Sequence, residues 1–434
     1  MKSKYTKYIL LFLFPISGII VWYIDKLINK FIFFPENYLT YLMQILGLVS
    51  ISLLSLNFVL SLKTRTTEKI FGGLDDQYKL HKLVGKIAMI TIIFHIGFGI
   101  IRSLPSAKAF SLYLIPGTNV NYNFGIFAFW ILIVLIFITL YLKLPYHIWK
   151  FTHRFLILPL ILSVIHIVLT SYSPTQVPLI VTFLIVIGLI GVSAYIYSEF
   201  ILYNFGPVYK YKIKEVNVEG NIIELFLDPV DKQLKFKAGQ YIFLSFLNNE
   251  SIESSIHPFS ISTAPNEKMR ISLKVLGDYT NRLRLAKQDD IVKLIGPFGE
   301  FHNDNFIDKK TQVWIAGGIG VTPFLSMLRE RFIKGINDTS IYFFYCVNKK
   351  EDAFYMNEIN ELAKKLENIQ IFMHYSEEEG FINSEYLRKK IGSDFDKSFF
   401  LICGPTKLMT SLDKDLKRVG KKSNDLFYEN FSFK

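Results

Sequence analysis

The chain has 434 residues, of which 51% are apolar and 16% aromatic, and its formal net charge at pH 7 is +12. The apolar content is high for a soluble protein and predicts a membrane part, while the length allows two or three domains. Two cysteines, Cys346 and Cys403, are too few for a disulfide framework or a cysteine metal site. No basic helix carries interleaved aromatic residues, so the positive charge does not indicate nucleic-acid binding.

Six apolar segments lie before Tyr203, and each is close to the ~20 residues that cross a bilayer core. They cover residues 8–24, 39–61, 80–101, 124–142, 148–170 and 178–200. The first contains Pro15, lacks a small-residue cleavage site and precedes five more segments, so we interpret it as a retained helix rather than a signal peptide. Charged residues dominate from Tyr203 onward, which predicts the main domain boundary there.

The loops between these segments differ in positive charge. One set contains Lys2, Lys4, Lys7, Lys63, Arg65, Lys69, Lys79, Lys143 and Lys150, and the opposite set contains Lys26, Lys30, Arg102 and Lys108. The positive-inside rule therefore predicts a cytoplasmic N-terminus and a cytoplasmic hydrophilic half. We expect an integral protein of the plasma membrane with lipid around its helices.

Four histidines lie within the predicted spans, His81 and His95 on the third and His153 and His166 on the fifth. Ionisable side chains inside a bilayer are costly and indicate function, and neutral imidazole is a ligand of haem iron. His81 would pair with His153 and His95 with His166, so that two haems lie about 21 Å apart along the helix axis. The alternative is that the histidines make interhelical hydrogen bonds.

The spacing in the fifth span does not suit an ideal helix. At 3.6 residues per turn His153 and His166 point roughly 140° apart, whereas His81 and His95 point roughly 40° apart. Pro159 lies between His153 and His166, and we expect it to bend or twist that helix.

Two further residues near these histidines are candidates for secondary roles. His147 is a spare ligand near the cytoplasmic surface. Arg102 follows His95 by two helical turns and would lie above the outer haem, where it would neutralise a propionate or attract a small anion. Alternatively, Arg102 is an ordinary charged residue that ends a span.

The hydrophilic half contains two different patterns. Short alternating strands at 222–227, 241–246 and 269–275, punctuated by Gly and Pro, predict a small antiparallel β-barrel. From Thr311 onward, strands alternate with helices, which predicts an open parallel sheet. Its expected strands are 313–316, 341–346, 371–375 and 399–403.

Three segments of this half favour cofactor binding. The loop Gly317-Gly318-Ile319-Gly320-Val321-Thr322-Pro323 follows a strand and opens a helix, as pyrophosphate-binding loops do, with a turn without ligand as the alternative. The segment Cys403-Gly404-Pro405 ends another strand and should line the same crevice. In the barrel, His257-Pro258-Phe259-Ser260-Ile261-Ser262-Thr263 offers an aromatic ring and hydroxyls to an isoalloxazine, although alone it is also an ordinary strand.

Together these features resemble the NADPH oxidase and ferric reductase superfamily, and specifically its compact prokaryotic NADPH oxidase homologues. The resemblance covers nearly the whole chain and rests on the histidine spacings and on HPFSIST, LGDYTNRL, GPFG, GGIGVTPF and CGP. It implies a six-helix di-haem membrane domain at 1–203, an FAD-binding antiparallel β-barrel at 204–305 and an α/β NAD(P)H-binding domain at 306–434. The last two would form a ferredoxin-NADP reductase-like module.

The resemblance also implies roles for individual residues. Pro258, Phe259, Ser260 and Thr263 look like flavin contacts, with Ser260 near the reactive N5, and His257 stands where many relatives carry Arg. Gly277 and Thr280 look like part of the FAD phosphate region. Cys403 resembles the residue beside the nicotinamide ring. Phe431 resembles a terminal aromatic lid that nicotinamide displaces, with core packing as the alternative.

The implied activity is electron transfer from NADPH through FAD and two b-type haems to oxygen outside the cell, which produces superoxide. Reduction of a ferric chelate by the same path is an alternative, and a haem-free flavoprotein fused to a transporter or scaffold is another. The short segment 102–123 leaves little room for a chelate, which favours oxygen.

Few residues bear on the choice of nicotinamide cofactor and on regulation. Lys349 and Lys350 favour the 2′-phosphate of NADPH, but Glu351 and Asp352 follow directly and leave NADH open. The larger relatives carry a calcium-binding extension that does not occur here, so we expect no obligate cytosolic activator.

Overall fold

The computed structural model describes residues 2–30, 32–104, 106, 108–171, 179–202, 206 and 208–429, except for the side chains at 2–6, 146, 147 and 171. The chain forms two compact units, residues 1–202 and 203–434. Each unit is described by itself.

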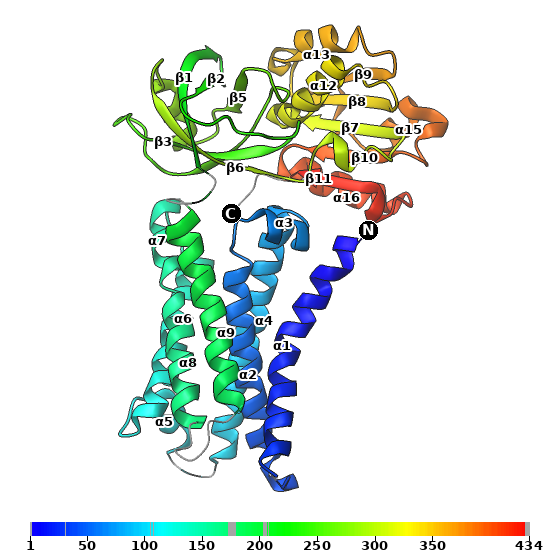
Figure 1. Cartoon of the computed structure of the whole chain (residues 1–434). Helices are drawn as coiled ribbons and strands as arrows, with labels where there is room; N and C mark the ends of the chain where they lie inside the picture. The colour runs from blue at the N-terminus through cyan, green and yellow to red at the C-terminus, as the bar shows by residue number, and fades with distance from the viewer. Residues whose placement is uncertain are drawn as a thin grey trace. The chain divides into compact units, whose positions relative to one another are not determined.

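The first unit is a bundle of long apolar helices (Figure 1). Among the described residues, six helical segments are long and apolar enough to cross a membrane, which confirms the predicted number: Lys7–Ile28, Pro35–Val59, Leu74–Arg102, Val120–Tyr141, Ile148–Thr170 and Leu179–Ile201. The long helices are α1 (Lys2–Ile28), α2 (Tyr38–Val59), α4 (Leu74–Arg102), α6 (Val120–Tyr141), α8 (Ile157–Ser171) and α9 (Leu179–Ile196). Shorter elements are η1 (Pro35–Asn37), α3 (Arg65–Phe71), α5 (Ala109–Leu114), α7 (Tyr146–Arg154) and the π-helical turn η2 (Tyr197–Ile201).

Apolar side chains cover both the inside and the outside of this bundle. Leu160 and Leu184 are fully buried between helices, whereas Phe12, Leu140 and Leu189 are mostly exposed. Large apolar side chains on an outer surface are unfavourable in water and are expected where a helix faces lipid. Helix α2 packs against both α4 and α9.

The fifth span differs from the predicted continuous helix. Helix α7 ends at Arg154 and α8 begins at Ile157, so the helix is interrupted at Phe155 and Leu156. Pro159 lies in the first turn of α8, where its missing amide hydrogen costs no helical hydrogen bond. If α7 and α8 formed one continuous helix, Pro159 would lack a hydrogen bond to the preceding turn and its ring would clash with that turn. The predicted distortion between His153 and His166 is therefore a break between two helices.

The second unit begins with a six-stranded antiparallel sheet in the order β4-β3-β6-β1-β2-β5. The strands are β1 (Val208–Glu219), β2 (Ile222–Pro229), β3 (Tyr241–Phe246), β4 (His257–Ser260), β5 (Met269–Lys274) and β6 (Ile291–Phe298). An antiparallel bridge between Ile261 and Ile271 joins the two ends of this order, so the sheet curls into a half-barrel around Ile213, Ile242 and Leu294. Helix α11 (Asp278–Arg282), η3 (Leu283–Leu285) and η4 (Asn303–Asn305) lie in its connections.

A five-stranded parallel sheet follows, in the order β11-β10-β7-β8-β9. Its strands are β7 (Thr311–Gly317), β8 (Ser340–Val347), β9 (Ile369–Tyr375), β10 (Phe399–Cys403) and β11 (Leu426–Glu429). Its connections contain η5 (Gly318–Val321), α12 (Thr322–Lys334), η6 (Lys350–Asp352), α13 (Met356–Ala363), α14 (Ser376–Glu379), α15 (Ser384–Ile391), η7 (Gly392–Asp394), α16 (Thr406–Arg418) and η8 (Ser423–Asp425).

Helices cover both faces of this sheet. Trp314 and Phe343 point toward α12 and α13, whereas their neighbours Val313 and Phe344 pack on the side of α15 and α16. The strand order reverses between β7 and β10, which is the place where sheets of this kind bind ligands. The loops after Gly317 and after Cys403 both begin at this point.

Candidate functional site

All four span histidines bond through Nδ1 to an oxygen atom on a neighbouring helix. His81 and His95 of α4 bond to the carbonyls of Asn57 (3.0 Å) and Met43 (2.7 Å) on α2. His166 bonds to the carbonyl of Asn121 on α6 at 2.8 Å. A carbonyl can only accept, so Nδ1 carries the proton in these three and the Nε2 lone pair is free for a metal.

His153 uses a side chain instead of a carbonyl. Its Nδ1 lies 3.3 Å from Oγ1 of Thr139 on α6, and that hydroxyl donates its proton to the carbonyl of Leu135 at 2.7 Å. The hydroxyl must therefore accept from His153, which fixes the same tautomer. Trp149 stacks on the imidazole, with ring centroids 4.9 Å apart and planes inclined by 22°.

The acceptor carbonyls are accessible for identifiable reasons. Asn57 lies in the last turn of α2, where the Ser61 amide bonds to Phe58 instead and leaves the Asn57 carbonyl without its helical donor. Gly47 and Gly125 lie one turn after Met43 and Asn121. A Cβ at Gly47 would come within 3.1 Å of the His95 ring, and one at Gly125 within 3.0 Å of the His166 ring. Both glycines therefore make room for an imidazole.

One of the two histidine pairs that the sequence predicts lies close together. The rings of His81 and His153 have centroids 6.2 Å apart. Two metal–nitrogen bonds of about 2 Å each, plus the half-widths of two imidazoles, also amount to roughly 6 Å, so an iron atom fits between these rings. The pairing of His95 with His166 stays a prediction. Because Asn57 and Met43 are 14 residues apart on α2, the two pairs are separated by about 21 Å.

The two secondary candidates gain no support. Arg102 is the last residue of α4 and is exposed. The side chain of His147 lies outside the described part of the structure. Both roles stay predictions.

In the half-barrel, part of the predicted flavin segment is free to contact a ligand. The Ser260 side chain is only 5% exposed, and its hydroxyl makes no hydrogen bond to any residue that the structure describes. Pro258 and Phe259 are partly exposed on the same strand. A Cβ added to Gly277 would have no atom within 4 Å, so open space lies beside this residue. The Thr280 hydroxyl is used locally, because it accepts from the Gly277 amide at 3.0 Å.

Tyr279 is a candidate that the sequence did not single out. Its ring stacks on His257 with centroids 3.6 Å apart, and its hydroxyl is buried without a hydrogen-bond partner among the described atoms. Burial and the charge of Glu253 raise the pKa of Tyr279, so the hydroxyl stays protonated and able to donate. An unpaired buried hydroxyl is unfavourable by itself and fits a site that an FAD oxygen or nitrogen would complete. Its position within the LGDYTNRL motif could have indicated Tyr279 as a candidate from the sequence.

Ser262 and Thr263 form hydrogen bonds within the reductase unit, and their predicted flavin contacts stay a prediction. The Ser262 hydroxyl bonds to Ser272 at 2.8 Å and receives Nε of Arg270 at 3.1 Å, while Thr263 accepts from the Arg270 amide and, through its carbonyl, from Ser326 of α12. Arg270 is 6% exposed and donates both terminal nitrogens to Glu358 of α13, each at 2.9 Å. These residues join the half-barrel to the parallel-sheet part.

Two glycines of the dinucleotide loop are tightly packed, whereas a third has open space beside it. A Cβ at Gly317 would lie 2.5 Å from Leu408, and one at Gly320 would lie 2.5 Å from the Cys403 carbonyl. Gly404 packs against the Gly317 backbone, so these three glycines allow the two predicted loops to touch. Gly318 has a φ of +54° and open space beside it. It is the glycine whose surroundings leave room for a pyrophosphate.

The remaining predicted residues lie at or near this junction. Thr322 and Pro323 open α12 and are buried, and the Thr322 hydroxyl bonds to the Ile319 carbonyl at 3.0 Å. Pro405 precedes α16. Cys403 is fully buried, and burial together with the charge of Glu429 raises the pKa of its thiol, which stays neutral. Phe431 lies outside the described residues, so its proposed lid role stays a prediction.

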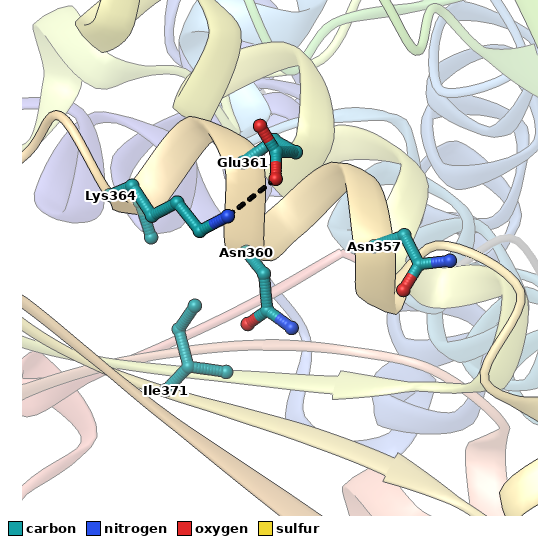
Figure 2. A pocket seen from close by; sticks show the side chains of 6 residues that line it. Asn357, Asn360, Glu361, Lys364 and Ile371 are labelled. Carbon is teal, nitrogen blue, oxygen red and sulfur yellow. Dashed lines mark hydrogen bonds and ion pairs between the residues drawn. The ribbon is translucent and has the colours of Figure 1, made fainter.

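A surface hollow is lined by none of the predicted site residues. Figure 2 shows Asn357, Asn360 and Glu361 projecting from α13, with Lys364 bonded to Glu361 at 2.6 Å and Ile371 of β9 below them. None of the residues that line this hollow lies in the loops after β7 and β10, where the strand order reverses. We therefore do not assign it to the nucleotide.

Comparison with known proteins gives three family matches in chain order. They are a ferric reductase like transmembrane component at 46–172, an FAD-binding domain at 208–321 and an oxidoreductase NAD-binding domain at 314–414. The chain has the domain architecture of the NADPH oxidase and ferric reductase superfamily. The matches thus combine a transmembrane family with an FAD-binding domain and an oxidoreductase NAD-binding domain in one chain.

Relatives match part of this architecture. The flavohemoprotein of Oceanobacillus iheyensis is 27% identical over 237 residues, which are 50% of this chain and 57% of the relative. The propane 2-monooxygenase reductase component of Rhodococcus jostii is 27% identical over 228 residues, 49% of this chain and 60% of that protein. The chain thus spans little more than half the length of these relatives.

A solved structure shows a similar fold over more of the chain. It is a flavohemoglobin from Malassezia yamatoensis with bound FAD and heme, with a TM-score of 0.51 and 18% identity over 92% of this chain and 98% of that one. At this identity the likeness concerns the fold alone. It agrees with the predicted fold class of apolar helices followed by a ferredoxin-NADP reductase-like module.

Proposed function

We propose that this superfamily member is an NAD(P)H oxidase that moves electrons through FAD and two b-type haems to oxygen on the outer side of the plasma membrane and releases superoxide. The observation that carries the proposal is the arrangement of the span histidines. All four bond through Nδ1 to a neighbouring helix, so each has Nε2 free for iron. Interhelical hydrogen bonding alone would explain the Nδ1 contacts but not the close approach of the His81 and His153 rings, whose centroids are 6.2 Å apart.

The chain's own residues would perform the following tasks. His81 and His153 would hold one haem, and His95 and His166 would hold the other. Ser260, Tyr279 and Gly277 would receive FAD, and the Gly318 loop would receive the dinucleotide. Bound FAD supplies the exchange between a two-electron hydride and single electrons, which haem iron carries one at a time. We place Cys403 and Phe431 beside the nicotinamide and the flavin.

Ferric-chelate reduction is the second candidate, because the matching membrane family is described as ferric reductase like. The electron path within the chain would be the same, and only the final acceptor would differ. The acceptor loop between α4 and α6 is short, which favours a small molecule such as oxygen.

The acceptor can be tested with purified protein in detergent, supplied with FAD, haem and NADH or NADPH. An oxidase should produce superoxide that a specific probe detects, and reduction of an added ferric chelate should be suppressed by superoxide dismutase. Chelate reduction that persists in air with superoxide dismutase present, without detectable superoxide, would favour the ferric reductase instead.

A further inference from the structure

We infer that this protein uses NADH in preference to NADPH, and that the carboxylates after β8 and β9 determine this preference. The inference rests on the proposed binding of a dinucleotide at the Gly318 loop. It revises the expectation from Lys349 and Lys350, which the sequence suggested as a site for the 2′-phosphate.

The strand register places these residues beside the dinucleotide loop. Gly317 at the end of β7 pairs with Cys346 near the end of β8, and Cys346 pairs in turn with His374 of β9. When pyrophosphate binds after the first strand of such a sheet, the ribose that carries the 2′ group is recognised after the second. Here that position is the segment 348–352.

The loop after β9 is fixed against this segment. The Glu377 amide donates to the Asn348 carbonyl at 3.2 Å, and the Ser376 hydroxyl donates to the Asn348 side chain at 3.1 Å. The buried His374 donates its Nε2 hydrogen to the Gly380 carbonyl at 2.8 Å, which anchors the far end of the same loop. The charged side chains of the loops after β8 and β9 therefore act on the same position, which is that of the 2′ group of the ribose.

Lys349 is not available as a free cation. Its Nζ lies 3.6 Å from Oε2 of Glu377, and both side chains are more than half exposed. Lys350 is followed directly by Glu351, and the Asp352 carboxylate lies 3.9 Å from Lys274 of the barrel. The two loops carry five carboxylates, against three lysines when Lys274 is included: Glu351, Asp352, Glu377, Glu378 and Glu379 against Lys274, Lys349 and Lys350.

This balance distinguishes the two cofactors. A phosphate monoester carries about −1.5 to −2 charges at pH 7, so the excess of two carboxylates repels the 2′-phosphate of NADPH. The 2′-hydroxyl of NADH is neutral and can donate a hydrogen bond to a carboxylate. Because the groups are exposed, salt should weaken the discrimination.

The test is anaerobic stopped-flow reduction of FAD in the full-length protein, with NADH and NADPH compared at low and high ionic strength. We expect NADH to have a kcat/KM about tenfold higher at low salt, equivalent to about 1.4 kcal/mol, with a smaller ratio at high salt. AMP should also compete with NADH better than 2′,5′-ADP does, which measures binding without turnover.

Two variants and a matched control locate the effect. Glu377→Gln should lower the NADH-to-NADPH ratio most, because it also releases Lys349, and Glu378→Gln should lower it less. Glu361→Gln removes an exposed carboxylate of α13 that bonds to Lys364, away from both loops, and should leave the ratio as in wild type. Equal or better use of NADPH by the wild type, or an unchanged ratio in Glu377→Gln, would overturn the inference alone. If neither nucleotide reduces FAD, the proposed function fails and the inference fails with it.

Discussion

The membrane unit and the reductase unit use their predicted site residues differently. In the membrane unit, all four histidines point one nitrogen at a neighbouring helix and leave the other free. In the reductase unit, Ser260 and Gly318 have unused groups or open space, whereas Ser262 and Gly320 are used by the fold itself. A histidine inside a bilayer has few structural uses, so its presence indicates function. A serine or glycine in a soluble motif has many, so its position in a motif does not establish contact with a ligand.

Replacing a histidine of the second pair should have the largest effect. Each of His95→Ala and His166→Ala removes one axial ligand, so we expect loss of one haem per chain and of nearly all electron delivery to oxygen. Haem content and superoxide formation measure this. Anaerobic FAD reduction by the nicotinamide should continue in both variants and serves as the internal control. Retention of two haems with full oxygen reduction would contradict the assignment.

The buried bond between the two parts of the reductase unit should contribute most to its stability. Arg270→Met removes two hydrogen bonds to Glu358, which keeps its bond to Arg329 at 2.8 Å, so we expect a loss of roughly 1.5–3 kcal/mol. Thermal unfolding followed by FAD release should show a large decrease in Tm. Arg388→Met removes the exposed pair with Asp396, for which we expect less than about 1 kcal/mol. Equal effects of the two substitutions would show that the Arg270 contact has no special role.

Thr139 should affect the first histidine pair without being a ligand. Thr139→Val removes the acceptor of the His153 proton, and loss of such a contact typically weakens metal affinity about 10–100-fold. Thr139→Ser keeps the hydroxyl and should behave as wild type. Haem titration of the three proteins, with the reduction potential of the bound haem, measures the effect. Equal affinity and potential in Thr139→Val would exclude a positioning role.

Two glycine substitutions separate packing from ligand binding in the reductase unit. Gly320→Ala places a Cβ 2.5 Å from the Cys403 carbonyl, so the protein should lose about 1–3 kcal/mol of stability. Gly277→Ala has open space and should fold normally but bind FAD more weakly. Tm of the FAD-free protein and FAD titration measure the two effects. A stable Gly320→Ala variant, or unchanged FAD affinity in Gly277→Ala, would contradict the corresponding assignment.

Much of the architecture could be predicted because it depends on local pattern. Apolar length predicted six spans, and the alternation of strands and helices predicted the half-barrel and the parallel sheet. The break before Pro159 was foreseen only as a distortion, since whether proline bends or ends a helix depends on its neighbours. The third span was predicted too short, because α4 begins at Leu74 with a polar turn that hydropathy does not include.

The contacts around the site could not be predicted in the same way. The Thr139 bond to His153 joins residues 14 positions apart and the Arg270 bond to Glu358 joins residues 88 positions apart, and no periodic pattern signals either contact. Gly47 and Gly125 gave a weak signal, because small residues in bulky spans often allow close approach of another helix. Their specific partners, the rings of His95 and His166, required the structure.

The most direct test of the electron path is an absorption spectrum of the purified protein with FAD, recorded under anaerobic conditions before and after addition of the nicotinamide. The account predicts that FAD is reduced first, that bands of two reduced b-type haems then appear, and that they disappear as superoxide forms when oxygen is admitted. A protein whose flavin is reduced but which shows no haem bands would contradict the ligand roles of His81, His95, His153 and His166.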